Sequence, residues 1–305
     1  MKTLVFTFLL INMALNLDAQ NFKISLYPEG MIPNSIPCKS MEIKDTSNIV
    51  RISNVQVPDI SVYLPSGRNA RDEAVIICPG GGYKVLAYDW EGGDIAKFWN
   101  SKGIAAIVLK YRLPSSVSQL EPHKAPLMDA QRAMRLVRYH AREWNINPDR
   151  IGIMGFSAGG HLASSLCTHF DNGDPDNNDP VERISCRPDF SMLIYPVITF
   201  TKASQHKGSR KTLAGEDEEL MNFYSSELQV NENTPPAILI HSSDDKSVPV
   251  ENSILYFNAL LSKNILVEMH IYPYGGHGFS LAIGKGGHLS TWTERCYDWL
   301  NNLNL

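Results

Sequence analysis

From Ala74 onward, short apolar runs alternate with longer amphipathic stretches. The runs are continuous and rich in β-branched residues, which is typical of buried strands; they are Ala74–Cys78, Ile104–Lys110, Ile151–Phe156, Phe190–Val197 and Ala237–His241. Amphipathic helices are predicted around Ile95–Trp99, over Pro126–Trp144, directly after Ser157 and over Trp292–Leu303. Val267–Tyr272 alternates apolar and polar positions, as a strand near a sheet edge would. The alternation predicts a mainly parallel central sheet with helices on both faces.

The region before Ala74 is less regular. Residues 21–48 include Pro28, Pro33 and Pro37 and predict an irregular N-terminal arm lying on the domain. Two β-rich runs follow, Val50–Val57 and Ile60–Leu64, and together they predict an antiparallel hairpin at one edge of the sheet. With no internal repeat and no second domain in the pattern, residues 49–305 are expected to fold as one unit.

The segment over residues 199–236 mixes polar runs with short helical stretches and precedes the strand predicted at Ala237–His241. Insertions at this position lie over the carboxyl ends of parallel strands, where folds of this class bind ligands. We therefore expect a polar lid or substrate-binding element here.

Two other polar features carry no predicted site. The helix predicted over Pro126–Trp144 has Arg135, Arg138 and Arg142 on one face, which we expect to face solvent. The stretch Asp171–Asp189 is dense in Asp, Asn, Gly and Pro, and a calcium loop is one reading of it. It lacks the ligand spacing and the terminal Glu of an EF-hand, so we predict no metal site.

Composition narrows the classes of partner. The chain has 305 residues, is 43% apolar and carries a formal net charge of −4. A nucleic-acid or anionic-membrane partner would need clustered basic surface, so neither is expected. Nothing in the pattern specifies an oligomeric state.

Residues 1–20 have the pattern of a secretory signal peptide. Lys2 is followed by the apolar stretch Leu4–Leu15, which is too short to span a bilayer, and the segment ends near Ala19. We expect cleavage after Ala19 or Gln20 and a secreted or periplasmic protein without stable membrane insertion. A retained N-terminal anchor is the alternative, because Leu17 fits the small-residue cleavage pattern poorly.

The five cysteines show no C-x-x-C spacing, and their odd number leaves at least one unpaired within the monomer. Cys78 and Cys167 fall in a predicted core strand and a predicted core helix, where a free thiol behaves as a small apolar group. A Cys167–Cys186 bridge across the polar loop stays open as an alternative, because export would permit it.

Candidate chemistry centres on Ser157. Gly155, Ser157 and Gly159 form the G-x-S-x-G pattern between a predicted strand and a predicted helix. At such a junction a sharp turn lifts the serine hydroxyl above the sheet and directs the first N–H groups of the helix toward the reacting group. A five-residue motif alone is a weak signal, so the prediction of Ser157 as a nucleophile depends on catalytic partners elsewhere in the chain.

A serine hydroxyl needs a histidine base that is itself oriented by a carboxylate. Two predicted strands after Ser157 end in suitable residues: one in Asp244 and Asp245, the other in His277, which lies among glycines. We predict Asp245 as the catalytic carboxylate, with the other aspartate capping the turn or the following helix. His277 is better placed than His288 or the other histidines.

The mechanism also needs donors for an oxyanion. The glycines after Ala74–Cys78 follow an early strand, and we predict the N–H groups of Gly81, Gly82 and Ala158 as these donors. An ordinary tight turn without a donor role is the alternative for the glycine cluster. This chemistry requires no cofactor.

Taken together, the motifs resemble a known family. They are Pro79–Tyr83, Lys110–Pro114, Gly155–Leu162, Asp244-Asp245 followed by Val248-Pro249, and Gly276–Phe279. This set resembles the secreted α/β-hydrolase carbohydrate esterases, the acetylxylan and feruloyl esterase-like proteins related to the hormone-sensitive-lipase group. The resemblance spans roughly residues 50–303 and implies an α/β-hydrolase fold. The chain departs from the lipase group at Pro79, where that group usually has a histidine.

The resemblance implies a serine carboxylesterase that removes acetyl or feruloyl groups from plant polysaccharide or oligosaccharide fragments such as acetylated xylan. Three alternatives are weaker. A serine peptidase of this type usually carries a large extra domain, a lipase should have an apolar lid where residues 199–236 are polar, and a non-catalytic binding protein would normally have lost a triad residue.

Overall fold

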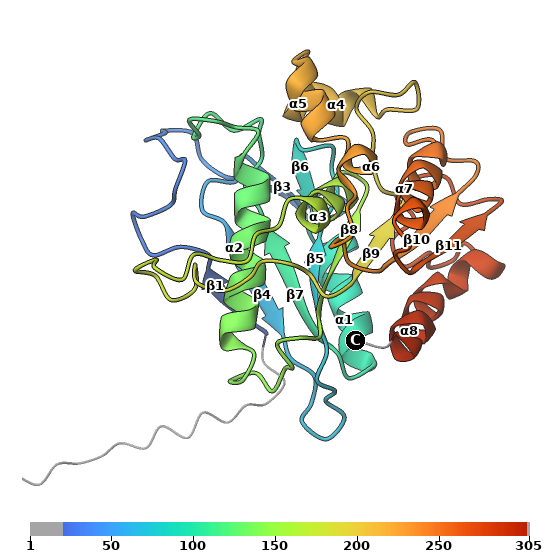
Figure 1. Cartoon of the computed structure of the whole chain (residues 1–305), viewed down its shortest axis with the longest axis horizontal. Helices are drawn as coiled ribbons and strands as arrows, with labels where there is room; N and C mark the ends of the chain where they lie inside the picture. The colour runs from blue at the N-terminus through green and yellow to red at the C-terminus, as the bar shows by residue number, and fades with distance from the viewer. Residues whose placement is uncertain (1–20, 304–305) are drawn as a thin grey trace, which may run out of the picture.

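The computed structural model describes residues 21–303, so the predicted signal peptide lies outside the described residues. A central sheet runs through this part of the chain (Figure 1), with its strands in the spatial order β1 (Asn21–Ser25), β4 (Asp59–Tyr63), β7 (Ala105–Lys110), β5 (Ala74–Cys78), β8 (Ile151–Phe156), β9 (Ser191–Ile194), β10 (Ala237–Ser242) and β11 (Val267–Tyr272). The strands from β7 to β11 are parallel, whereas β4 and β1 join antiparallel. The predicted mainly parallel sheet is confirmed, with β11 at its edge.

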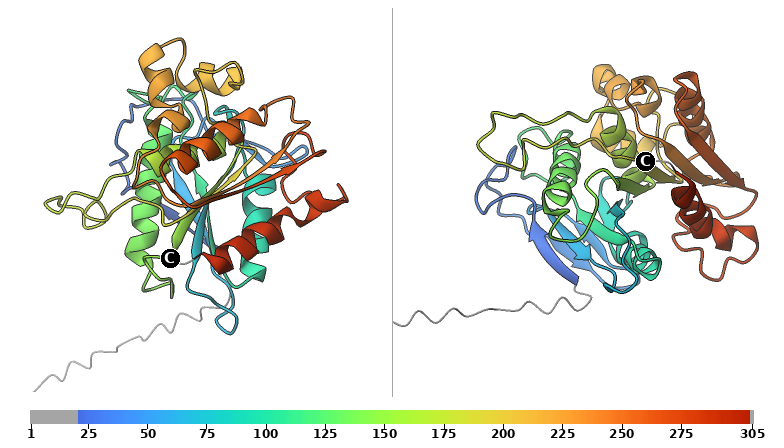
Figure 2. Two further views of the ribbon diagram at one scale, coloured as in Figure 1. Left: turned by 45° about the vertical axis from the view of Figure 1, so that its right-hand side comes forward. Right: turned by 60° about the horizontal axis from the view of Figure 1, so that its bottom comes forward.

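Each central strand contributes side chains to two apolar layers. In β5, Ile76 and Cys78 belong to one layer, while Val75 and Ile77 belong to the other, as the two-residue period of a strand requires. The first layer is covered by α2 (Ala125–His140), α3 (Ala158–Thr168) and α7 (Glu251–Ser262). The second is covered by α1 (Asp94–Ser101) and α8 (Trp292–Asn302), so helices lie on both sides of the sheet (Figure 2).

The strands near the N-terminus pair differently from the predicted hairpin. β4 lies between β1 and β7, whereas β3 (Arg51–Ser53) pairs with β2 (Ile43–Asp45) and β6 (Val85–Ala87) in a separate small sheet. Asn54 adopts a φ of 53° directly after β3 and turns the chain away, so the two runs do not pair. The hairpin prediction is therefore wrong, and residues 21–48 are irregular only outside β1 and β2.

Of the three arginines expected to face solvent, Arg142 is exposed, whereas Arg135 and Arg138 are not. Arg135 is buried, pairs with Asp171 and donates to the carbonyl oxygen of Ile184 at 2.9 Å. Arg138 donates to the carbonyl oxygen of Ser185 at 2.6 Å and pairs with Asp189. These two side chains fasten the polar loop over residues 171–189 to α2, although most residues from 171 to 180 are exposed.

The segment between β9 and β10 carries three short helices, α4 (Lys207–Leu213), α5 (Glu218–Phe223) and α6 (Ser226–Gln229), of which α4 and α5 stand at the top of the molecule in Figure 1. A role as a lid stays a prediction. Cys167 and Cys186 are both free, so the bridge left open above does not form. Among the helices of residues 21–303, none combines the length and the apolar character needed to cross a bilayer.

A buried ion pair joins the end of β7 to α2. Arg112 and Asp129 are both completely buried, and the Arg112 Nη2 atom lies 2.7 Å from Oδ1 of Asp129. The backbone N–H of Arg112 also donates to Asp129 Oδ2 at 2.8 Å. This carboxylate therefore compensates both a buried charge and a buried backbone donor.

We expect Asp129→Ala to lower the free energy of unfolding by about 3–5 kcal/mol, because it leaves the buried Arg112 guanidinium without its counter-ion. The exposed pair of Lys97 with Asp94, whose side chains are 72% and 38% exposed, supplies the control. Asp94→Ala should cost less than about 1 kcal/mol. Urea unfolding followed by tryptophan fluorescence measures both, and equal losses would contradict the expectation.

Candidate active site

Ser157 stands between β8 and α3 in a strained backbone conformation, with φ 53° and ψ −118°. Left-handed φ values are costly for a residue with a side chain, so the surroundings must enforce this one. They do so through close approach: a Cβ on Gly155 would lie 2.1 Å from the carbonyl oxygen of Gly159, and one on Gly159 would lie 2.1 Å from that of Cys78. The glycines on either side of Ser157 are therefore required by packing.

The predicted histidine and carboxylate meet the serine. His277, between β11 and η2 (His288–Thr291), has its Nε2 atom 2.8 Å from Oγ of Ser157. Its Nδ1 atom lies 2.6 Å from Oδ2 of Asp245, in the loop after β10. Because an ionised carboxylate can only accept, Nδ1 carries the proton and Nε2 is left to accept from the serine hydroxyl. The three side chains form one continuous hydrogen-bonded chain.

Asp245 is held as an anion. Its side chain is fully buried, and Oδ1 accepts the backbone N–H groups of Ser247 and Val248, each at 2.9 Å. Burial acts to raise the pKa of Asp245, but the hydrogen bonds from His241 and His277, the charge of His277 and the Val248 N–H together bring it well below its usual range. The carboxylate is therefore ionised throughout the neutral range and able to stabilise a protonated His277.

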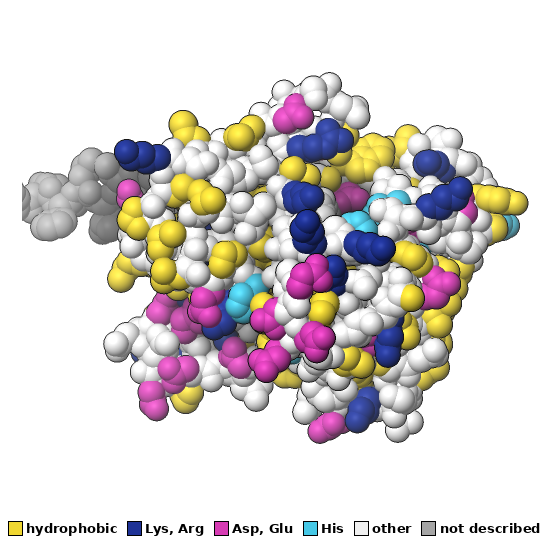
Figure 3. Space-filling view, turned by 90° about the horizontal axis from the view of Figure 1, so that it is seen from above, with side chains coloured by type: hydrophobic (Ala, Val, Ile, Leu, Met, Phe, Trp, Pro, Cys, Tyr) yellow, Lys and Arg dark blue, Asp and Glu magenta, His cyan; other side chains and the backbone are white. Residues whose placement is uncertain are grey.

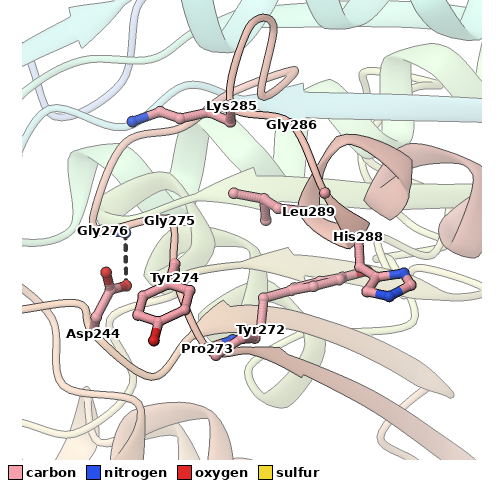
Figure 4. A pocket seen from close by; sticks show the side chains of 11 residues that line it. Asp244, Tyr272, Pro273, Tyr274, Gly275, Gly276, Lys285, Gly286, His288 and Leu289 are labelled. Carbon is pink, nitrogen blue, oxygen red and sulfur yellow. Dashed lines mark hydrogen bonds between the residues drawn. The ribbon is translucent and has the colours of Figure 1, made fainter.

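The neighbouring Asp244 has a different partner. Its Oδ1 atom accepts the backbone N–H of Gly276 at 2.8 Å, a contact drawn in Figure 4. Gly276 precedes His277 and has a φ of 64°. The two adjacent carboxylates thus hold the same loop at two points, Asp245 at the His277 ring and Asp244 at the backbone.

A surface pocket of about 670 Å³ lies behind this loop, between the residues after β11 and those around Lys285–Leu289 (Figure 4). Asp244, Tyr274 and Gly276 contribute to its wall, but Ser157, Asp245 and His277 do not. It is a neighbour of the candidate site and not the site itself. His288, the alternative histidine of the sequence, lines this pocket instead of meeting Ser157.

The glycine loop after β5 lies directly against the serine. An ideal Cβ on Gly80 would be 3.0 Å from the Cβ of Ser157. Gly81 has a φ of 135° and Gly82 a φ of 63°, and a Cβ on Gly81 would lie 2.1 Å from the carbonyl oxygen of Val85. Within the described residues the N–H groups of Gly81 and Gly82 donate no hydrogen bond to protein, so both remain free to bind a ligand. Ala158 begins α3, where a backbone N–H has no helical partner.

Sequence reasoning missed three buried residues around this centre. His241, in β10, lies with its Nε2 atom 3.4 Å from Oδ2 of Asp245 and 2.9 Å from the carbonyl oxygen of Val248. Tyr195 and Glu91 hydrogen-bond to each other beside His277. A histidine ending a strand next to the predicted aspartates was a usable signal for His241, whereas no pattern marked the other two.

The face that carries α4 and α5 is seen from above in Figure 3. Lys and Arg side chains follow one another down the middle of this face, Asp and Glu side chains gather mainly in its lower part, and hydrophobic and histidine side chains also reach the surface.

Residues 60–260 match the BD-FAE family, which is more than half of the chain. The chain belongs to the BD-FAE family. The matched range contains Ser157 and Asp245 but ends before His277.

Two relatives are similar to this chain over about three quarters of its length. The endo-1,4-beta-xylanase B of Butyrivibrio fibrisolvens is 41% identical over 74% of this chain and 35% of its own length. The acetylxylan esterase of Xylanibacter ruminicola is 39% identical over 71% of this chain and 42% of its own length. The chain therefore spans less than half the length of these relatives.

A solved structure matches over nearly the full length of both chains. The acetyl ester-xyloside bifunctional hydrolase from Caldicellulosiruptor lactoaceticus is 41% identical, with a TM-score of 0.79, and the alignment covers 94% of this chain and 97% of that one. The carboxylesterase Cest-2923 from Lactobacillus plantarum, at 20% identity and a TM-score of 0.67, shares the fold.

The ionised Asp245 predicts a pH-dependent contribution to stability. A carboxyl group whose folded pKa is depressed stabilises the fold above its unfolded pKa of about 3.9, and this contribution disappears as the pH falls through the folded value. We expect Asp245→Asn to cost about 2 kcal/mol at pH 7 and progressively less below about pH 4. Urea unfolding at pH 7 and pH 3 measures the two differences; a cost independent of pH would show that the charge contributes nothing.

Proposed function

We propose that this protein is an exported serine esterase that removes acetyl groups, and feruloyl groups where they occur, from plant polysaccharide or oligosaccharide fragments such as acetylated xylan. The observation that carries the chemistry is the hydrogen-bonded chain from Ser157 through His277 to Asp245 at the strained turn after β8. The substrate class is supported by the names of the similar proteins, which include an acetylxylan esterase and an acetyl ester-xyloside hydrolase. Export is supported by the signal-peptide pattern of residues 1–20.

Acylation begins at the serine. Oγ of Ser157 attacks the carbonyl carbon of the ester while Nε2 of His277 takes the hydroxyl proton. The buried carboxylate of Asp245 stabilises the resulting imidazolium through Nδ1. The negative charge that develops on the carbonyl oxygen is bound by the N–H groups of Gly81, Gly82 and Ala158.

Collapse of this intermediate releases the sugar alcohol. The imidazolium of His277 returns its proton to the leaving sugar oxygen, and the acyl group remains on Ser157. Water then attacks the acyl-enzyme with His277 again as the base, and the proton taken from water goes back to the Ser157 oxygen as the acid departs. The net change is one ester and one water converted to a carboxylic acid and an alcohol.

Product release from acetylated, feruloylated xylan fragments tests this function directly. With the mature protein we expect acetate to form, and Ser157→Ala should lower the rate by a factor on the order of a million. Acetate alone would identify a deacetylase, whereas acetate with ferulate would identify a broader esterase. Hydrolysis of a small aryl acetate without either product would refute the substrate class and keep the serine esterase.

The paired aspartates supply a second test. Asp245→Asn should reduce the kcat for an aryl acetate by roughly ten-thousandfold, because the amide no longer holds His277 in the required tautomer. Asp244→Asn removes only a charge from the contact with the Gly276 N–H, and we expect a loss of about tenfold or less. The reverse order would assign the catalytic role to Asp244.

A further inference from the structure

Glu91 places a second buried carboxylate beside the site, with no role in the mechanism above. It belongs to the π-helical turn η1 (Asp89–Gly93) and is only 5% exposed. Its Oε2 atom accepts the backbone N–H of Gly80 at 2.8 Å, and its Oε1 atom accepts the hydroxyl of Tyr195 at 2.8 Å. A Cβ on Gly80 would lie 2.6 Å from Oε2, so a glycine at this position is what admits the carboxylate.

Tyr195 continues the network to the histidine. Its ring packs edge-on against His277 with the ring centroids 5.0 Å apart. Its hydroxyl oxygen accepts the backbone N–H of Ser280 at 3.1 Å. Because a backbone N–H can only donate, the hydroxyl proton of Tyr195 is directed at Glu91, and the network is satisfied when Glu91 is a carboxylate acceptor.

Opposing contributions set the pKa of Glu91. Burial raises this pKa above its usual value, and the hydrogen bonds from Tyr195 and Gly80 and the charge of His277 offset only part of the rise. A positive charge on His277 would therefore stabilise the ionised form of Glu91, and an ionised Glu91 would in turn stabilise a positive charge on His277.

The same turn contacts the histidine loop through a second residue. Trp90 donates its indole N–H to the carbonyl oxygen of Gly278 at 3.1 Å, and the hydroxyl of Ser280 donates to the Trp90 carbonyl oxygen. The turn η1 thus touches both segments that have to be aligned around the reacting ester: the glycine loop through Gly80 and the histidine loop through Gly278 and Ser280.

We propose that Glu91 is a positioning residue of the esterase site, one that fixes the Gly81 and Gly82 N–H groups through Gly80 and the His277 ring through Tyr195. This inference rests on the proposed function of Ser157. Gly81 and Gly82 have positive φ values, and glycine populates many conformations, so hydrogen bonds must restrict this loop. The carbonyl oxygens of Gly80 and Gly81 accept the backbone N–H groups of residues 84, 85 and 87, and Glu91 adds the contact that holds the N–H of Gly80.

The test uses Glu91→Gln with p-nitrophenyl acetate, a substrate that is independent of the sugar. The amide can accept from only one of its two donors, so we expect kcat to fall about 10- to 100-fold while KM changes less than about twofold. Inhibition by an aryl trifluoromethyl ketone, which binds serine esterases as an oxyanion, should weaken by a similar factor. Full kcat in a folded Glu91→Gln variant would overturn the proposal, as would a rise in KM alone.

Glu73→Gln is the matched control. Glu73 is also a buried glutamate, 1% exposed and paired with Arg71 and Arg150, but it precedes β5 whereas Gly80 follows that strand. It should lose stability in urea unfolding and keep its kcat. A similar fall in kcat for both variants would reduce the role of Glu91 to general stability and overturn the proposal.

Tyr195→Phe decides the matter if Glu91→Gln does not fold, because it keeps the ring on His277 and removes the hydroxyl. We expect a fall in kcat of about tenfold with KM nearly unchanged; an unchanged kcat would overturn the proposal.

Ser157→Ala separates the test of the Glu91 proposal from the test of the proposed function. If Ser157→Ala keeps the rate, the proposed function fails, whereas loss of the rate in Ser157→Ala with full activity in both Glu91→Gln and Tyr195→Phe refutes only the role of Glu91.

Discussion

The backbone strain at Ser157 is the constraint on which the site depends. A φ of 53° is tolerated because β8, α3 and the end of β5 approach so closely that the neighbouring glycines admit no side chain. That closeness also brings the glycine loop after β5 against the serine. The packing of one strand, one helix and one loop therefore produces both a raised hydroxyl and the free N–H groups next to it, and the large parallel sheet provides the rigidity that such close contacts need.

Two buried carboxyl groups lie on different sides of His277, the residue that takes up a proton in the proposed reaction. Asp245 contacts Nδ1 directly, and Glu91 lies behind Tyr195, whose ring packs on the imidazole. Both carboxylates are buried and bound by backbone N–H groups, so neither needs to reorganise when charge develops. The site is built from fixed dipoles and fixed charges, which suits a reaction that moves one proton back and forth.

Much of this was predictable from sequence, and the failures have physical reasons. The strand-to-helix turn, the order of serine, aspartate and histidine, and the parallel sheet follow from apolar runs and from residues placed at strand ends. The N-terminal pairing was missed because β4 joins β1 and β7, partners that no local pattern reveals. Arg135 was assigned to solvent because its burial depends on a loop many residues away, and Glu91 was missed because its partners converge only in the folded chain.

The small second sheet also supports the site. β6 follows the glycine loop after β5 and pairs with β3, so residues 51–53 hold the outer end of this loop in place. His277 lies beyond the other end of the matched family range of 60–260. A fragment limited to residues 60–260 would keep Ser157 but would lose both β3 and His277. The groups around Ser157 therefore depend on the whole stretch of chain from β3 to the loop that carries His277, and a shorter fragment could not reproduce the site.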